Sequence, residues 1–117
     1  MDNKFYVSLE AAKLLKEKGY DIKRDFLTPV YNENGCLYWS NHEDLSDKIP
    51  AITKAEAIDW LESQGIIIEI FQDYRKLWFY VIKRSETESY VSEADDKYFS
   101  TRLEAEEAAI IDALELL

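Results

Sequence analysis

Three segments of the sequence carry apolar residues at helical spacing, and each follows a residue that can cap the N-terminus of a helix. Ser8 precedes the first segment, which we predict as a helix over 9–18 because a basic last turn and a glycine follow. Thr53 begins the second helix, which reaches about Gln64, and Thr101 begins the third, which continues to the end of the chain. A glutamate three residues after each threonine completes a capping box, so both helix starts are sharply defined.

The segment after the first helix predicts a β-hairpin. The runs 26–31 and 36–40 are rich in β-branched and aromatic residues, and an Asn-Gly dipeptide at 34–35 lies between them. This dipeptide is typical of a two-residue type I′ turn. Such a turn places Tyr31 opposite Tyr38, on a face of the hairpin that we expect to be wet.

The segment between the second and third helices predicts a three-stranded meander. The runs 66–71 and 77–82 are almost wholly apolar and form the central strands, and 89–92 adds the third strand. The predicted register of the central pair groups six large residues on one face. They are Ile66, Ile68, Ile70, Trp78, Tyr80 and Ile82.

The order of elements is therefore helix, hairpin, helix, three-stranded meander, helix. This order predicts a single domain over 1–117 in the α+β class, with an antiparallel sheet and helices packed on it. The polar stretch 41–52, which contains Pro50, is expected to be a loop.

Charge narrows the classes of partner. The chain has 24 acidic and 14 basic residues among 117, a net charge of -10. Residues 1–84 hold 14 acids and 12 bases, whereas 85–117 hold 10 acids and two bases. Such a balance argues against a surface for phosphates or anionic lipids, so we expect no direct nucleic-acid contact and no membrane contact.

The scarcity of chemically reactive residues excludes several kinds of site. The only cysteine is Cys36 and the only histidine is His42, so neither a disulfide nor a Cys/His zinc cluster can form within the chain. All three glycines serve as helix or turn signals, which leaves none for a phosphate-binding loop. The sequence therefore predicts no catalytic residues, no cofactor and no metal. The cysteine usage and the lack of a signal peptide or long apolar run predict a cytoplasmic protein.

Aromatic residues suggest one contact surface. Three large rings follow one another at 78–80, so a strand there places rings on both faces of the sheet. A helix or a partner chain, such as the second copy in a homodimer, must cover the face that points away from the core. On the first hairpin, Tyr31 and Tyr38 are the candidate partner-binding residues.

Acidic residues suggest another surface. Glu104, Glu107 and Asp112 lie mainly off the apolar stripe of the last predicted helix. They could form a solubilising face, bind a basic protein partner, or imitate the phosphates of DNA and so occupy a DNA-binding protein.

A set of short motifs resembles a known group of proteins. The motifs are SLEAA at 8–12 with Gly-Tyr at 19–20, IPAIT at 49–53 with WLE at 60–62, and TRLEA at 101–105. Together they span most of the chain and resemble small uncharacterised proteins of gut-bacterial phages, prophages and other mobile elements. The resemblance implies a mobile-element accessory protein and brings no catalytic residues with it.

These observations lead to one expected function and two alternatives. The expected function is a noncatalytic protein-interaction module of phage or mobile-element origin. The first alternative is an acidic DNA-mimic inhibitor of a DNA-binding protein. The second is a small enzyme of unrecognised type, which the lack of an assembled nucleophile, base and orienting group disfavours.

Overall fold

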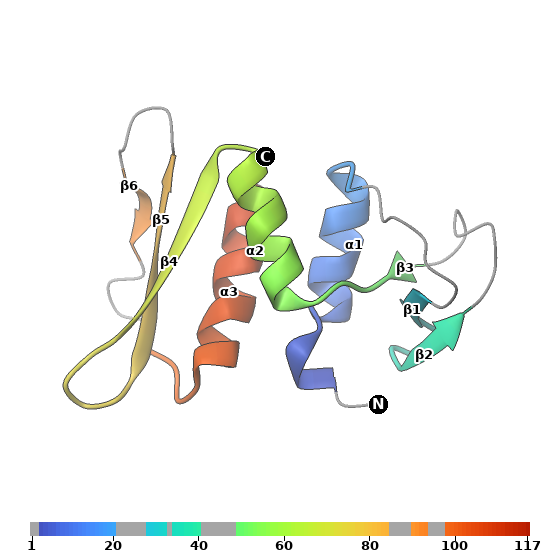
Figure 1. The fold of residues 1–117 in the computed structure, drawn as a ribbon, viewed down its shortest axis with the longest axis horizontal. Coiled ribbons are helices and arrows are strands. Elements are labelled where there is room, and N and C mark those ends of the chain that lie inside the picture. The colour runs from blue at the N-terminus through green and yellow to red at the C-terminus, as the bar shows by residue number, and fades with distance from the viewer. Residues whose placement is uncertain (1–2, 21–27, 33, 41–48, 85–89, 94–97) are drawn as a thin grey trace.

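The computed structural model describes residues 3–20, 28–32, 34–40, 49–84, 90–93 and 98–117. Its strands form two separate antiparallel sheets, in the orders β2-β1-β3 and β4-β5-β6. A layer of helices lies between the sheets, and the described part of the chain measures 44 × 31 × 20 Å (Figure 1). The predicted α+β class is confirmed, with two small sheets in place of one. The helices are η1 (Asn3–Phe5, 3-10), α1 (Leu9–Glu17), α2 (Lys54–Ser63) and α3 (Arg102–Glu115), and the strands are β1 (Thr28–Tyr31), β2 (Leu37–Ser40), β3 (Ile49–Pro50), β4 (Ile66–Gln72), β5 (Trp78–Arg84) and β6 (Tyr90–Glu93).

The three predicted α-helices begin at the predicted caps. The hydroxyl of Ser8 accepts a hydrogen bond from the amide three residues later, and Thr53 and Thr101 do the same in the second and third helices. All three helices run in the same direction, so their N-terminal ends gather on one side of the molecule, at the lower edge of the helix layer in Figure 1.

Helix α3 lies at the centre of the packing. It contacts α1, α2, β4 and β5. Ala105, Ala109 and Ala113 are fully buried and recur every four residues, which places them along one ridge of the helix. Small side chains on that ridge let neighbouring elements approach α3 closely. Ile110 and Leu114, which are also fully buried, fill the space beside the ridge.

The central hairpin has the predicted register. Ile68 pairs with Ile82 and Ile70 pairs with Tyr80, so the predicted residues share one face. This face packs against the helices, and Ile82 and Tyr80 are almost completely buried. On the opposite face, the Glu69 carboxylate lies 2.6 Å from the ammonium group of Lys83.

The first hairpin forms in a different register from the predicted one. Tyr31 pairs with Leu37, whereas Tyr38 pairs with Val30, a shift of one residue. Since a shift of one residue moves side chains to the other face, Tyr31 turns inward and is only 7% exposed. Its hydroxyl donates a hydrogen bond to the backbone carbonyl of Val7.

The turn of this hairpin explains the shift. The side-chain oxygen of Asn32 accepts hydrogen bonds of 2.9 Å from the amides of both Asn34 and Cys36. Gly35 has a φ of +79°, but Asn34 does not have the positive φ that a type I′ turn requires. The turn therefore runs from Asn32 to Cys36 and is one residue longer than the Asn-Gly dipeptide suggested.

The predicted loop at 41–52 contains a short strand in its described part. Ile49 and Pro50 form β3 at the edge of the first sheet, where a proline is tolerated because it needs no hydrogen-bond partner for its nitrogen. The amide of Val7 donates to the carbonyl of Ile52 at 2.9 Å, which ties the N-terminal segment to the residues before α2.

Burial of Ile68 on the helix-facing side of the large sheet yields a stability prediction. Ile68→Ala should lower the free energy of unfolding by about 2–5 kcal/mol, because it removes buried methyl groups and leaves a cavity. Chemical denaturation followed by circular dichroism measures the change. Trp39→Ala is the matched control, since Trp39 is 51% exposed. An unchanged midpoint for the Ile68 variant would contradict this packing.

Candidate functional site

The two tyrosines expected on a contact surface lie in different environments. Tyr31 is part of the buried core and its hydroxyl is bound to the backbone carbonyl of Val7, so its ring does not lie on an outer face of the hairpin. Tyr38 is half-buried on the other face of the hairpin. The structure therefore does not bring these two rings together on one wet face, and the prediction of that face is wrong.

The three acidic residues expected on the last helix also differ from one another. Glu104 is exposed, and its backbone amide is bound by the Thr101 cap. Glu107 is half-buried and accepts a hydrogen bond of 2.8 Å from the amide of Ser8. Asp112 accepts a hydrogen bond from the hydroxyl of Tyr80. The Glu104 carboxylate also accepts a hydrogen bond of 3.2 Å from the hydroxyl of Thr101, so all three carboxylates have contacts within the chain, and only Glu104 is exposed.

The Tyr80 hydroxyl is held in its neutral form. Its burial, followed by the hydrogen bond and the negative charge of Asp112, raises the pKa of Tyr80 well above its usual value of 10.0. This contact joins β5 to α3 and gives Asp112 a clear structural role.

A cluster of aromatic residues and one arginine lies at the turn between β4 and β5. Tyr74 is 93% exposed, and Phe71 and Tyr98 are 40% and 45% exposed. We call this cluster the hairpin-end surface. It consists of Phe71, Tyr74, Arg75, Phe79 and Tyr98.

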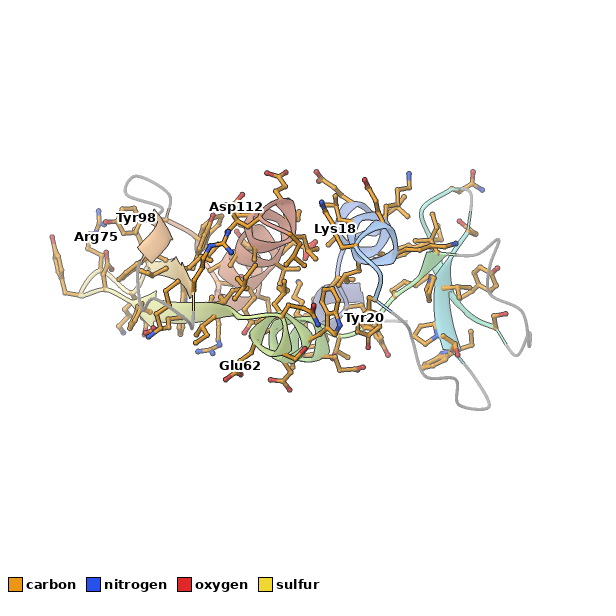
Figure 2. The ribbon with its side chains drawn as sticks, turned by 90° about the horizontal axis from the view of Figure 1, so that it is seen from above. Lys18, Tyr20, Glu62, Arg75, Tyr98 and Asp112 are labelled. Atoms are coloured by element: carbon orange, nitrogen blue, oxygen red, sulfur yellow. The ribbon has the colours of Figure 1, made fainter. Side chains whose placement is uncertain are left out.

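Ring contacts order the hairpin-end surface. Phe71 stacks on Phe79 with a distance of 5.4 Å between ring centroids, and Phe79 meets Tyr98 edge to face at 6.1 Å. The Arg75 guanidinium lies 4.6 Å from the centroid of the Tyr98 ring. Figure 2 shows Arg75 and Tyr98 beside one another at the end of the molecule away from α1.

Asp73 fixes the turn that carries this surface. One of its carboxylate oxygens accepts from the amides of Arg75 and Leu77 at 2.9 and 3.1 Å. The other accepts two hydrogen bonds from the Arg75 guanidinium at 3.0 and 2.8 Å. Desolvation opposes ionisation, but these hydrogen bonds from Arg75 and Leu77 outweigh it and hold the pKa of Asp73 below its usual range. The aspartate therefore orients the backbone and Arg75 together.

A groove lies on the side of the molecule where the helices begin. It consists of two hollows of about 690 Å³ and 340 Å³, which share the residues Lys54 and Glu107. We call it the Lys54–Glu107 groove. Phe99, Leu103, Ala108 and Ile111 line the larger hollow, and Tyr6, Leu9, Tyr31 and Gly35 line the smaller one.

The two shared residues have few partners. Lys54 is 8% exposed, and its ammonium group donates to the carbonyl of Lys4 at 2.7 Å. One carboxylate oxygen of Glu107 is bound to Ser8, while the other is buried without a hydrogen-bond partner. No ion pair between Lys54 and Glu107 occurs in the described structure.

Little in the described residues points to metal binding or to a membrane-spanning helix. Their His, Cys, Asp and Glu side chains form no group of three that could hold a metal ion. Cys36 is a free, exposed thiol, whereas His42 and the acidic residues at 94–97 lie outside the described residues. No described helix has both the length and the apolar character needed to cross a bilayer.

Comparisons of the chain with protein-family models, with curated proteins and with solved structures find no match. The similarity to proteins of phages and mobile elements therefore stays a prediction.

The sequence predicted rings on the outer face of the strand at 78–80, which include Phe79, but it predicted neither the turn residues of the hairpin-end surface nor the Lys54–Glu107 groove. The hairpin-end surface had a signal, because Asp-Tyr-Arg at 73–75 places an aspartate at the first position of a turn, where it can bind later amides. Lys54 gave no comparable signal, since a lysine after a cap is usually exposed. Its burial results from the N-terminal segment, which folds across the start of α2.

The Tyr80–Asp112 contact predicts alkaline instability. Unfolding lets Tyr80 ionise near its ordinary pKa of 10.0, whereas the folded state keeps its proton to higher pH. The unfolded state therefore binds fewer protons, and the free energy of unfolding falls as pH rises above 10. Denaturation at pH 9 and pH 11 measures the slope, which Tyr80→Phe should reduce. An equal slope in both proteins would contradict the prediction.

The turn at the hairpin end predicts a stabilising substitution. Lys76 has a φ of +64°, a left-handed conformation that glycine adopts without steric cost. Lys76→Gly should raise the free energy of unfolding by about 0.5–1 kcal/mol, the relief of strain exceeding the entropy that glycine adds to the unfolded chain. Lys13→Gly, in the middle of α1, is the control and should be destabilising. If both substitutions lowered the free energy of unfolding, the result would contradict a strained left-handed conformation at Lys76.

Proposed function

We propose that the protein is a noncatalytic interaction module and that the hairpin-end surface is its protein-binding site. The observation that supports this proposal is an ordered group of exposed aromatic rings around Arg75. Tyrosine and arginine are among the residues most enriched at the energetic centres of protein interfaces. Exposed apolar groups on a folded protein favour a role in binding when they form one continuous patch.

The fixed conformation of the hairpin-end surface also favours binding. Asp73 holds the turn and Arg75 in place before a partner arrives, and Tyr98 stacks beneath the guanidinium. A surface that is already ordered loses less conformational entropy on association, so more of the contact energy is available as affinity. Tyr74, which is almost fully exposed, is positioned to be the central contact.

The acidic alternative has weaker support. A DNA mimic needs carboxylates that project into solvent at regular spacing, but Glu107 and Asp112 are bound within the chain. Glu104 alone among the three predicted residues is exposed. The aromatic surface is therefore the better site for partner contact.

Cellular context is part of the same proposal. An exposed free thiol at Cys36 suits a reducing compartment, so we place the interaction in the cytoplasm. A mobile-element origin suits a small module whose partner is a host or phage protein.

Photo-cross-linking tests the proposed site. A p-benzoyl-phenylalanine residue in place of Tyr74 should give a discrete cross-linked product in cells, which mass spectrometry identifies. The same residue in place of Trp39 is the control, because Trp39 is also an exposed aromatic residue but lies on the other sheet. Identical products from both positions, or none from Tyr74, would count against the hairpin-end surface.

A variant of the same surface separates binding from folding. Tyr74→Ser with Arg75→Ser should weaken association with the identified partner at least about tenfold, with little change in the fold because both side chains are exposed. If the cross-linked partner is a second copy, light scattering should show a homodimer for the original protein and a monomer for the double variant.

A further inference from the structure

We propose that the free edge of β4, the side of this strand that points away from β5, is a second binding site. It takes an extended, basic segment of another protein as an additional antiparallel strand. β4 is an edge strand of the sheet β4-β5-β6, and Figure 1 shows that it starts beside the end of α2 and then runs away from the helices. The site shares Phe71 with the hairpin-end surface but needs neither Tyr74 nor Arg75, so it does not rest on the function proposed above.

Hydrogen bonds of the neighbouring strand show which backbone groups point to the free edge. Trp78 exchanges two backbone hydrogen bonds of 2.8 Å with Phe99, so its amide and carbonyl point away from β4. Trp78 is paired with Gln72, and these directions alternate along an antiparallel ladder. The backbone groups that point to the free edge therefore belong to every second residue of β4, namely Ile66, Ile68, Ile70 and Gln72.

These amides and carbonyls have no hydrogen-bond partner in the part of the chain that the structure describes. The strand becomes more accessible along its length, since Ile66 is buried, Ile70 is half-buried and Gln72 is exposed. Proteins often protect a long edge strand with a proline or a bulge. β4 has no proline, and the register shift of this sheet lies between β5 and β6. Donors and acceptors that recur at strand spacing match an extended backbone, which is the ligand that this edge selects.

Charge selects the kind of strand. Glu69 lies at the middle of β4, on the outer face of the sheet, which points away from the helices, and its side chain is 33% exposed. Its partner Lys83 belongs to β5, so a residue of an added strand would meet Glu69 from the opposite side. A lysine or arginine directly opposite a glutamate stabilises a strand pair.

Helix α2 adds a second negative charge near the start of this edge. α2 lies between β4 and α1 in Figure 1, and the ring of Trp60 meets that of Tyr20, which follows α1, at 5.4 Å. Glu62 is two residues further along and so lies about 200° around the helix, on the side of β4. Figure 2 shows Tyr20 and Glu62 on different sides of α2. Glu62 is exposed and has no ion-pair partner among the described residues, so it also favours a basic strand.

A second copy of this chain suits the edge less well. Two β4 strands paired antiparallel over their full length would place the two copies of Glu69 opposite each other. Like charges in that position destabilise a sheet, and the net charge of -10 on each copy adds to the repulsion. The occupant is therefore a strand of a different protein that carries a lysine or arginine between β-branched residues.

Two isomeric peptides test the pairing. The probe is acetyl-Thr-Val-Thr-Lys-Thr-Val-Thr-amide, whose lysine lies opposite Glu69 when its lysine and valines share the outer face. In this arrangement the threonine amides point to β4 and the valine amides point away from it. N-methylation of the two threonines that flank the lysine removes two donors and should weaken binding at least about tenfold. N-methylation of the two valines gives a peptide of the same composition and should leave binding unchanged.

Hydrogen exchange of the protein shows where the peptide binds. At saturation, the peptide should slow exchange of the amides of Ile68 and Ile70 at least about tenfold, because both point to the free edge. The amides of Glu69 and Phe71 point to β5, so their exchange should be almost the same with and without peptide. A ligand docked on a face of the sheet would not produce this alternation.

Variants of the protein test the individual groups. Gln72→Pro removes one donor at the free edge without breaking the ladder to β5, and it should weaken peptide binding at least about fivefold, whereas Gln72→Ala keeps the donor and is its control. Glu69→Gln should weaken binding about threefold, and Glu17→Gln, at an exposed acid of α1, should not. Tyr74→Ser with Arg75→Ser should bind the peptide as the original protein does, which separates this site from the hairpin-end surface.

Three results would overturn the proposal. The first is equal binding of the two methylated peptides, or the reverse order. The second is the absence of alternating protection at the highest soluble concentration of the unmethylated peptide. The third comes from light scattering, where a dimer that Gln72→Pro converts to a monomer would show that a second copy occupies the edge. If a variant does not fold, the two methylated peptides on the original protein still decide.

Discussion

The close approach of other elements to α3 is the constraint on which this structure depends. Every other large element except the first hairpin packs on this helix, and its buried ridge consists of alanines at 105, 109 and 113. A larger side chain there would push α1, α2 or the large sheet away, because packed interiors have little free volume. The neighbours follow the same rule, since Ala11, Ala12 and Ala57 are also almost completely buried. The protein therefore builds its core from close contacts between helices, with large side chains such as Tyr80 and Leu61 filling the space around them.

Local signals predicted the elements of this fold better than their assembly. Capping residues and apolar periodicity were sufficient for the three helices and for the register of β4 and β5, because each of these depends on residues close in sequence. The predicted register of the first hairpin was wrong by one residue. The side chain of Asn32 binds two later amides, and this contact competes with the turn that the Asn-Gly dipeptide predicts. The alanine ridge was overlooked because alanine is a helix former anywhere, so its occurrence says nothing about which helix will be central. The Lys54–Glu107 groove could not be predicted, since its residues come from segments that meet only in the folded chain.

Charge has a different role in this protein from the one that composition suggests. A net charge of -10 points to a repulsive surface, yet several carboxylates join elements that are distant in sequence. Glu107 binds the start of α1, and Asp112 binds the hydroxyl of Tyr80 on β5. The parallel direction of the three helices adds to the demand for acids, because their positive dipole ends lie on the same side of the molecule. Each first turn carries one glutamate, at positions 10, 56 and 104. Some of the acidic side chains therefore stabilise the fold, so fewer of them remain to bind a basic partner.

The two surfaces depend on different parts of this architecture. The hairpin-end surface rests on one turn, in which Asp73 binds both the backbone and Arg75, so it needs little from the rest of the molecule beyond the strands that carry it. The Lys54–Glu107 groove needs the whole helix layer, because its residues come from the N-terminal segment, α2 and α3. A substitution that loosens the packing of α3 should therefore disturb the groove first, while the turn at the hairpin end keeps its local hydrogen bonds. The hairpin-end surface should therefore tolerate changes in the core, whereas the shape of the groove depends on the packing of the core.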